Sequence, residues 1–96
     1  MPPVFKANGV GVITIGTAGI PIQLPVIKCS RVMICASDNN LNLIVVGDNT
    51  VNASLRNGII LQPSFSQWFY PSSTNQLWVD AITSGSVFSY YYEISQ

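Results

Sequence analysis

Residues 76–94, QLWVDAITSGSVFSYYYEI, decide the fold of this 96-residue chain. They contain two runs rich in β-branched and aromatic residues, 76–82 and 87–94, separated by Thr83-Ser84-Gly85-Ser86. Such runs suit pleated strands that are buried on one side, and serine, threonine and glycine favour tight turns. The stretch therefore predicts two strands joined by a turn.

The same alternation of strand-like runs and turn residues extends over the rest of the chain. Within it, Asn57-Gly58 predicts a type I′ hairpin turn, because both residues accept a positive φ. Strands that recur every 8–12 residues are typical of an antiparallel sandwich. We predict an all-β, single-domain β-sandwich, jelly-roll-like or a small barrel, with about eight short strands. The predicted strands are residues 10–15, 20–24, 28–37, 41–47, 58–61, 64–70, 76–82 and 87–94.

The first nine residues differ from this pattern. Met1-Pro2-Pro3 suits neither a helix nor a central strand, and Ala7-Asn8-Gly9 resembles a hinge. We predict an extended N-terminal arm over residues 1–9 and a β-sandwich domain over residues 10–96. Val4 and Phe5 are then candidate docking groups on the arm. The alternative is an edge strand or a frayed end.

Charge is scarce in this protein. Charged residues make up 8% of the chain, four basic against four acidic, and histidine is absent, whereas typical domains carry about 25%. Four basic side chains do not favour a nucleic-acid partner. The lack of histidine excludes imidazole relays and imidazole metal ligands. No signal peptide or membrane-spanning run is apparent, so we expect synthesis in the cytoplasm.

The remaining reactive side chains do not predict catalysis, and we expect no enzyme activity, cofactor or metal. Cys29 and Cys35 lie six residues apart in one predicted strand, where their Cα atoms are about 20 Å apart, too far for a disulfide. The acidic residues occupy turns or the outer faces of strands, and nothing holds two of them in a cleft. They are Asp38, Asp48, Asp80 and Glu93.

Alternation along the strands assigns an outer face to several large side chains. Arg31, Asp80 and Glu93 are costly to bury, so residues two positions away should share their outward direction. Clustered outward aromatic and aliphatic groups indicate a partner surface. The alternative is a second buried layer under a covering loop. The interface candidates on strands are Met33, Trp78, Ile82 and Tyr91.

Three consecutive aromatic residues, Trp68-Phe69-Tyr70, indicate a different function. Trp68 and Tyr70 alternate onto one face and are candidate platforms for stacking on sugar rings. β-Sandwiches often carry lectin sites. The aromatic run therefore predicts, as an alternative, a carbohydrate- or receptor-binding module.

Several segments together resemble the small β-sandwich structural proteins of tailed bacteriophages, the capsid cement or decoration type. The chain departs from that pattern at Pro63-Ser64, where proline-glycine is expected, and in its aromatic run at residues 68–70. The segments that carry the resemblance are Gly16-Thr17-Ala18, Gln23-Leu24-Pro25, residues 29–36, Val45-Val46-Gly47, residues 75–85 and residues 87–92.

The resemblance implies a non-enzymatic virion protein on the capsid surface. It would be made in the host cytoplasm, form a homo-oligomer, a trimer or a dimer, and bind the major capsid protein. The carbohydrate- or receptor-binding alternative would then belong to a phage tail or fibre. From the composition we expect no nucleic-acid or membrane partner.

Overall fold

The computed structural model describes residues 5–95 and contains eight strands and one short 3₁₀ turn. All eight predicted strands are present, although most are shorter than predicted because turns take up their ends. The elements are β1 (Phe5–Ile15), β2 (Ile22–Gln23), β3 (Arg31–Ala36), β4 (Ile44–Gly47), β5 (Ile59–Leu61), β6 (Ser66–Phe69), η1 (Thr74–Gln76), β7 (Trp78–Ala81) and β8 (Ser86–Ser95).

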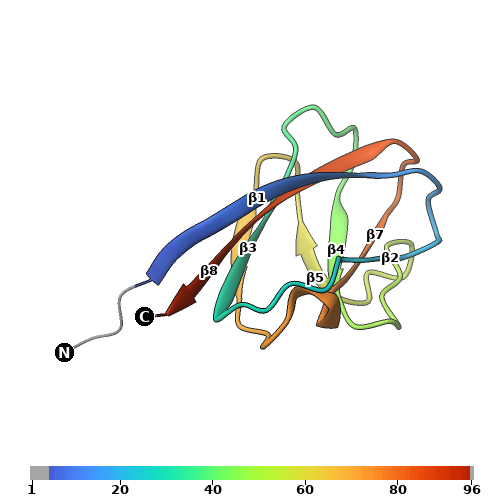
Figure 1. Cartoon of the computed structure of the whole chain (residues 1–96). Coiled ribbons are helices and arrows are strands. Elements are labelled where there is room, and N and C mark those ends of the chain that lie inside the picture. The colour runs from blue at the N-terminus through green and yellow to red at the C-terminus, as the bar shows by residue number, and fades with distance from the viewer. Residues whose placement is uncertain (1–4, 96) are drawn as a thin grey trace.

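The strands form two four-stranded antiparallel sheets, ordered β1-β8-β3-β6 and β2-β7-β4-β5 (Figure 1). The chain pairs first strand with last, second with seventh, third with sixth and fourth with fifth. This is a long hairpin that has been rolled into two layers, the jelly-roll form of the β-sandwich. The predicted fold class is confirmed.

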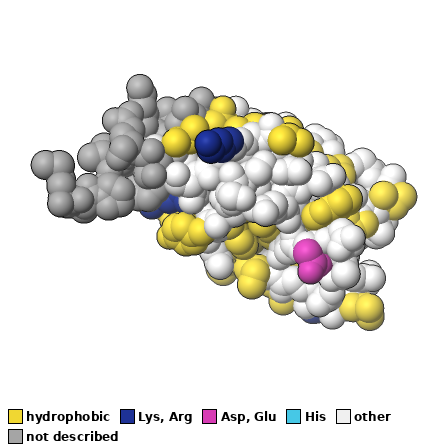
Figure 2. Space-filling view, turned by 60° about the horizontal axis from the view of Figure 1, so that its bottom comes forward, with side chains coloured by type: hydrophobic (Ala, Val, Ile, Leu, Met, Phe, Trp, Pro, Cys, Tyr) yellow, Lys and Arg dark blue, Asp and Glu magenta, His cyan; other side chains and the backbone are white. Residues whose placement is uncertain are grey.

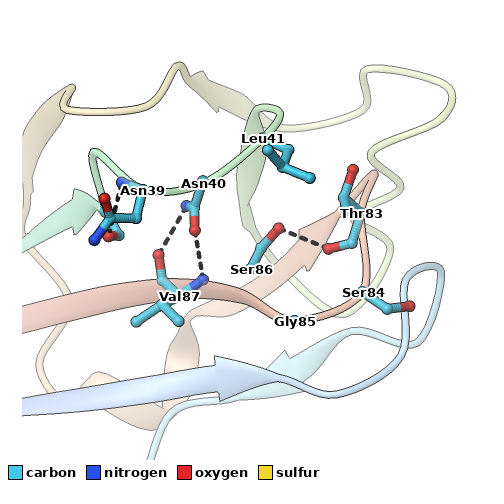
Figure 3. Close-up of a pocket in the computed structure, with 9 residues that line it drawn as sticks. Asn39, Asn40, Leu41, Thr83, Ser84, Gly85, Ser86 and Val87 are labelled. Atoms are coloured by element: carbon cyan, nitrogen blue, oxygen red, sulfur yellow. Dashed lines mark hydrogen bonds between the residues drawn. The ribbon is translucent and has the colours of Figure 1, made fainter.

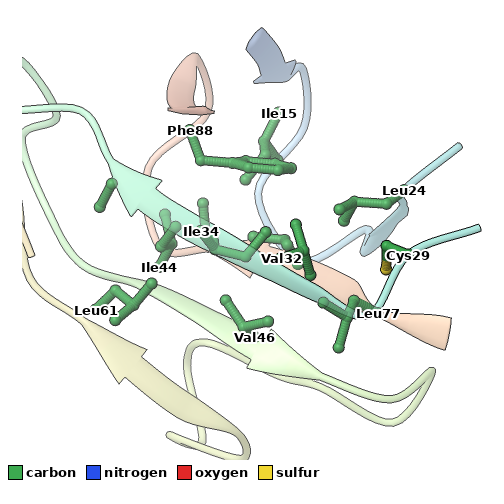
Figure 4. Packing of buried hydrophobic residues seen from close by; sticks show 13 residues of the cluster. Ile15, Leu24, Cys29, Val32, Ile34, Ile44, Val46, Leu61, Leu77 and Phe88 are labelled. Atoms are coloured by element: carbon green, nitrogen blue, oxygen red, sulfur yellow. The ribbon is translucent and has the colours of Figure 1, made fainter. Parts of the chain in front are cut away.

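The hydrophobic core lies between the two sheets (Figure 4). Because Arg31 directs the other face of β3 outward, the alternation sends Val32, Ile34 and Ala36 inward, and all three are fully buried. Phe88 from β8 is equally buried. The other buried members are Ile15, Leu24, Cys29, Ile44, Val46, Leu61, Leu77, Val79 and Ala81.

The described part of the predicted arm is strand. Residues 5–9 belong to β1 and pair with the end of β8, from Phe5 opposite Ser95 to Gly9 opposite Tyr92, with a bulge between Ala7 and Gly9. The pairing of β3 with β8 stops at Glu93, so the outermost β1–β8 pairs extend past β3 as a two-stranded ribbon (Figure 1). Phe5 thus lies in an edge strand, the alternative to a free arm. Val4 lies outside the described residues.

A covering loop, residues 48–58, creates a second buried layer on the outer face of the second sheet. Val51 and Ala53 from this loop pack with Leu43 and Val45, and Trp78 and Ile82 pack against the same cluster. The loop turns at residues 53–56, where the N–H of Arg56 donates to the carbonyl of Ala53. The predicted type I′ turn at Asn57-Gly58 is wrong, because Asn57 has no positive φ and instead bridges to Asn52.

Asp80, expected to mark a solvent-facing position, is 1% exposed beneath this loop. Its Oδ1 accepts the N–H of Gly19 at 2.9 Å and its Oδ2 accepts the N–H of Ala53 at 2.8 Å. The carboxylate therefore ties two loops, distant in sequence, to the outer face of the second sheet. Alternation placed Asp80 on the correct face, but it could not show that a loop covers that face.

Pro63-Ser64, which stands where the resemblance led us to expect proline-glycine, lies in a turn with an unusual backbone conformation. Ser64 has a φ of 75°, and the N–H of Phe65 donates to the carbonyl of Gln62 at 2.9 Å. Proline followed by a residue with positive φ is the type II turn, which favours glycine at this position. Serine is strained there because its Cβ approaches the following carbonyl oxygen.

We predict that Ser64→Gly raises the free energy of unfolding by about 0.5–1 kcal/mol. Relief of the left-handed strain exceeds the extra freedom that glycine gives the unfolded chain. Urea denaturation measures the change. Ser54→Gly is the control, because Ser54 lies in a turn without a positive φ, and it should give no stabilisation. A destabilised Ser64→Gly protein would contradict the turn geometry.

We also predict that Asp80→Ala lowers the free energy of unfolding by about 3–6 kcal/mol. The substitution leaves the N–H groups of Gly19 and Ala53 without their acceptor, and hydrogen bonds to a charged group contribute about 1.5–3 kcal/mol each. Asp38→Ala, at an exposed position, should change stability by less than about 0.5 kcal/mol. Equal effects of the two substitutions in urea denaturation would refute the anchoring role of Asp80.

Candidate interaction surface on the first sheet

The outer face of the first sheet carries a row of apolar and aromatic residues that crosses all four strands. Val10 of β1 lies opposite Tyr91 of β8, Tyr91 lies opposite Met33 of β3, and Met33 lies opposite Trp68 of β6. Their sequence neighbours on β3 and β8 point into the core, so the row faces outward. The row joins two predicted interface residues, Met33 and Tyr91, to Trp68.

A second row lies beside the first and is smaller and less apolar. It runs from Val12 through Ser89 and Cys35 to Ser66. Val10 and Val12 are 73% and 71% exposed, whereas Met33, Cys35, Trp68 and Tyr91 are half-buried. This face is therefore open at the β1 edge and more tightly packed towards β6. We call the two rows together the outer apolar face.

Four side chains at one end of the outer apolar face form a connected network. Arg31 makes an ion pair with Oε1 of Glu93 at 2.6 Å, and the Tyr91 hydroxyl donates to Oε2 of Glu93 at 2.8 Å. The Arg31 guanidinium lies 4.0 Å from the centre of the Trp68 ring. Trp68 meets Tyr91 edge to face at 6.0 Å. The network holds both aromatic rings in fixed positions.

Glu93, expected to face solvent, points outward from the sheet but is 7% exposed. Its neighbours Arg31 and Tyr91 cover it and satisfy both of its oxygens. In the sequence, Arg31 and Glu93 indicate only an outward direction, and their pairing was not predicted. The opposite charges of Arg31 and Glu93, both at outward strand positions, were the signal in the sequence for this ion pair. The pair could not be assigned because the sequence does not show the register of β3 against β8.

The structure separates the remaining interface candidates from this face. Trp78 and Ile82 belong to the second sheet and pack against the cluster under the covering loop. Both side chains are half-buried beside the covering loop, which favours the alternative of a second buried layer, and their place in an interface stays a prediction. The exposed aromatic side chains of the described residues, Phe65 and Tyr70, flank β6 of the first sheet.

The sugar-stacking candidates lie at the β6 edge of the first sheet. Tyr70 is 72% exposed just beyond the end of β6. Trp68 is half-buried, and Arg31 covers one side of its ring. Only the other side of the Trp68 ring remains for stacking, so the pair forms a smaller platform than the sequence indicated.

A shallow hollow of about 320 Å³ lies between the loop at residues 37–41 and the turn at residues 83–87 (Figure 3). Its lining side chains are uncharged. Asn40 donates to the carbonyl of Val87 and accepts its N–H, and the Ser86 hydroxyl donates to the carbonyl of Thr83. These bonds continue the sheet into the loop, which gives the lining residues a structural role.

The described residues offer no evident reactive centre. Hydrogen bonds from Thr50 hold the pKa of Asp48 below its ordinary value, and burial raises the pKa of the Cys29 thiol. Cys29 and Cys35 are both free thiols. Within residues 5–95, no group of three or more His, Cys, Asp or Glu side chains is placed to hold a metal ion.

No family model, no curated protein and no solved structure matches the chain. Among the described elements, no helix has the length and apolar character needed to cross a membrane. The function must therefore be argued from the outer apolar face and from the composition.

We predict that Tyr91 makes stability depend on pH in the alkaline range. The hydrogen bond to Glu93, burial and the charge of Glu93 raise the pKa of Tyr91 above 10.0, against an opposing effect of Arg31. The proton is therefore bound more tightly in the folded state, and the resulting stability is complete below about pH 10 and is lost as the pH rises through the folded pKa.

Urea denaturation of the wild type and Tyr91→Phe between about pH 8 and pH 11.5 tests this. The difference between their free energies of unfolding should be constant below about pH 10 and shift against the wild type above it. A difference that stays the same over the whole range would show that Tyr91 does not donate to Glu93.

Proposed function

We propose that this protein is a non-enzymatic structural subunit of a tailed-bacteriophage virion, of the capsid cement or decoration type. It self-associates and binds the assembled major capsid shell through the outer apolar face of its first sheet. The main observation in support of this proposal is the row Val10–Tyr91–Met33–Trp68, in which apolar groups extend across a whole sheet. The proposed location is the capsid surface, after synthesis in the host cytoplasm.

The residues of this face are the types that anchor protein interfaces. Tryptophan, tyrosine and arginine are enriched among the residues that dominate binding energy, and Trp68, Tyr91 and Arg31 lie here in mutual contact. Because the network fixes their conformations, little side-chain freedom is lost when a partner covers them. The exposed Val10 and Val12 extend this anchor towards the β1 edge.

The scarcity of charge supports the proposal that this protein works as part of an assembly. Proteins are kept apart in solution chiefly by charge, and only 8% of this chain is charged. The face shown in Figure 2 carries scattered hydrophobic side chains and few charged ones. A standard contact covers about 800 Å² on each partner, about 15% of the 5295 Å² surface of this chain.

The fold is compatible with this function without establishing it. Jelly rolls occur in viral capsid proteins and in lectins, so the fold agrees with both the cement hypothesis and its carbohydrate-binding alternative. The resemblance of residues 16–92 to phage structural proteins favours the first. Repetition of a modest contact over many lattice positions would stabilise a shell through multivalency.

Substitution on the outer apolar face tests the proposal. Val10→Gln combined with Met33→Gln removes two apolar groups from the row without adding charge. We expect binding to coat-protein shells, measured by co-sedimentation, to weaken about tenfold or more.

The matched control is Val26→Gln combined with Leu55→Gln, at positions 79% and 76% exposed on other parts of the surface. It should behave as the wild type. A wild-type protein that is monomeric and ignores shells would refute the proposal. Glycan-array binding that is lost in Trp68→Ala would establish the carbohydrate-binding alternative in its place.

A further inference from the structure

The first sheet has one long edge strand that lacks the usual protection against pairing. β2 has two residues and lies between Pro21 and Pro25, while β6 has four and lies between Pro63 and Pro71. β5 has three residues. β1, by contrast, runs for 11 residues without proline, with a bulge only near its start. Short strands and prolines prevent edge pairing in natural sheets, so β1 is the edge open to another strand.

The hydrogen bonds of β8 show which main-chain groups of β1 face away from the sheet. The carbonyl of Val87 accepts the N–H of Ser37, and its N–H donates to Asn40, both on the β3 side. Alternate residues of an antiparallel strand bond to opposite sides. Phe88 and Tyr90 therefore bond towards β1, to their partners Ile13 and Gly11.

It follows that the N–H and C=O groups of Val10, Val12 and Thr14 point to the free edge. These three residues are exposed. No strand among the described residues pairs with this side of β1. The edge thus presents a regular ladder of donors and acceptors, flanked by three β-branched side chains suited to cross-strand contacts.

We propose that β1 pairs with β1 of a second copy of this chain, antiparallel about a two-fold axis, with Val12 opposite Val12. In this register Val10 of each copy lies opposite Thr14 of the other. Every outward N–H of the three residues then meets a carbonyl, and all directly opposed side chains are β-branched. The two sheets become one sheet of eight strands, and their outer apolar faces become continuous.

The charge pattern favours a second copy as the occupant. The sequence of β1 contains one charged residue, Lys6. The proposed register places Lys6 opposite residue 18 of the other copy, beyond the end of β1 at Ile15, so the two lysines do not face each other. The outward N–H and C=O groups of β1 are self-complementary about Val12. The paired residues carry no charge that would favour an acidic or basic strand from another protein.

This inference rests on the self-association in the proposed function and specifies how it occurs. Pairing along one edge covers less than a standard interface of about 1,600 Å². We therefore expect a dimer with a Kd in the micromolar range or weaker in solution. A shell that binds both outer faces would strengthen it through multivalency.

Amide hydrogen exchange on the wild-type protein, followed by NMR, tests the pairing directly. In a concentrated sample the N–H groups of Val10, Val12 and Thr14 should exchange at least tenfold more slowly than in a dilute one. The N–H groups of Gly11 and Ile13, bonded to β8, should be protected at both concentrations. Rapid exchange at Val10, Val12 and Thr14 in a concentrated, associated sample would overturn the inference.

A pair of substitutions at one position separates the main chain from the side chain. Val12→Pro removes an outward N–H that β8 does not use, which an edge strand tolerates, and should weaken dimerisation at least tenfold. Val12→Ala keeps that N–H and should weaken it about fivefold at most. The exchange protection of Gly11 and Ile13 reports whether each variant keeps the β1–β8 pairing.

Failure of this inference is distinct from failure of the proposed function. Undiminished self-association in Val12→Pro, or a protein that binds shells but stays monomeric in solution, would overturn edge pairing and leave the shell-binding function standing. A wild-type protein that neither associates nor binds shells would overturn both.

Discussion

The double pairing of β8 is the constraint on which the rest of this structure depends. β8 bonds to β1 along one side and to β3 along the other, so its residues cannot slip without breaking two ladders. A shift by one residue would turn Phe88 out of the core and move Glu93 away from Arg31. The same register that closes the core therefore assembles the network on the outer face.

Two of the four carboxylates organise this protein from buried positions. Asp80 binds two loop N–H groups on the second sheet, and Glu93 binds Arg31 and Tyr91 on the first. Removing one partner from a buried charge is strongly destabilising, so each site defines a specific local arrangement. The two outer faces then differ: a loop covers the Asp80 face, and the Glu93 face stays open.

That difference determines which surface is available to a partner. The covering loop buries Leu43 and Val45 on the second sheet and packs with the half-buried Trp78. The first sheet keeps Val10 and Val12 exposed beside an ordered cluster of tyrosine, tryptophan and arginine. A chain with so little charge has few other means of recognition. The proposed contacts with partners therefore use the outer apolar face and the adjoining β1 edge.

The sequence by itself determined the fold class and the inward faces, because the period of two along each strand is a local property. It placed all eight strands, and it directed Val32, Ile34 and Ala36 to the core. Which outward residues meet solvent depended on contacts between segments far apart in the chain. Burial of Asp80 required a loop to fold back over the second sheet, and the contact of Arg31 with Trp68 required β3 to lie between β8 and β6. Only the tertiary structure decided these, since alternation assigns a side chain to a face and cannot show what covers that face.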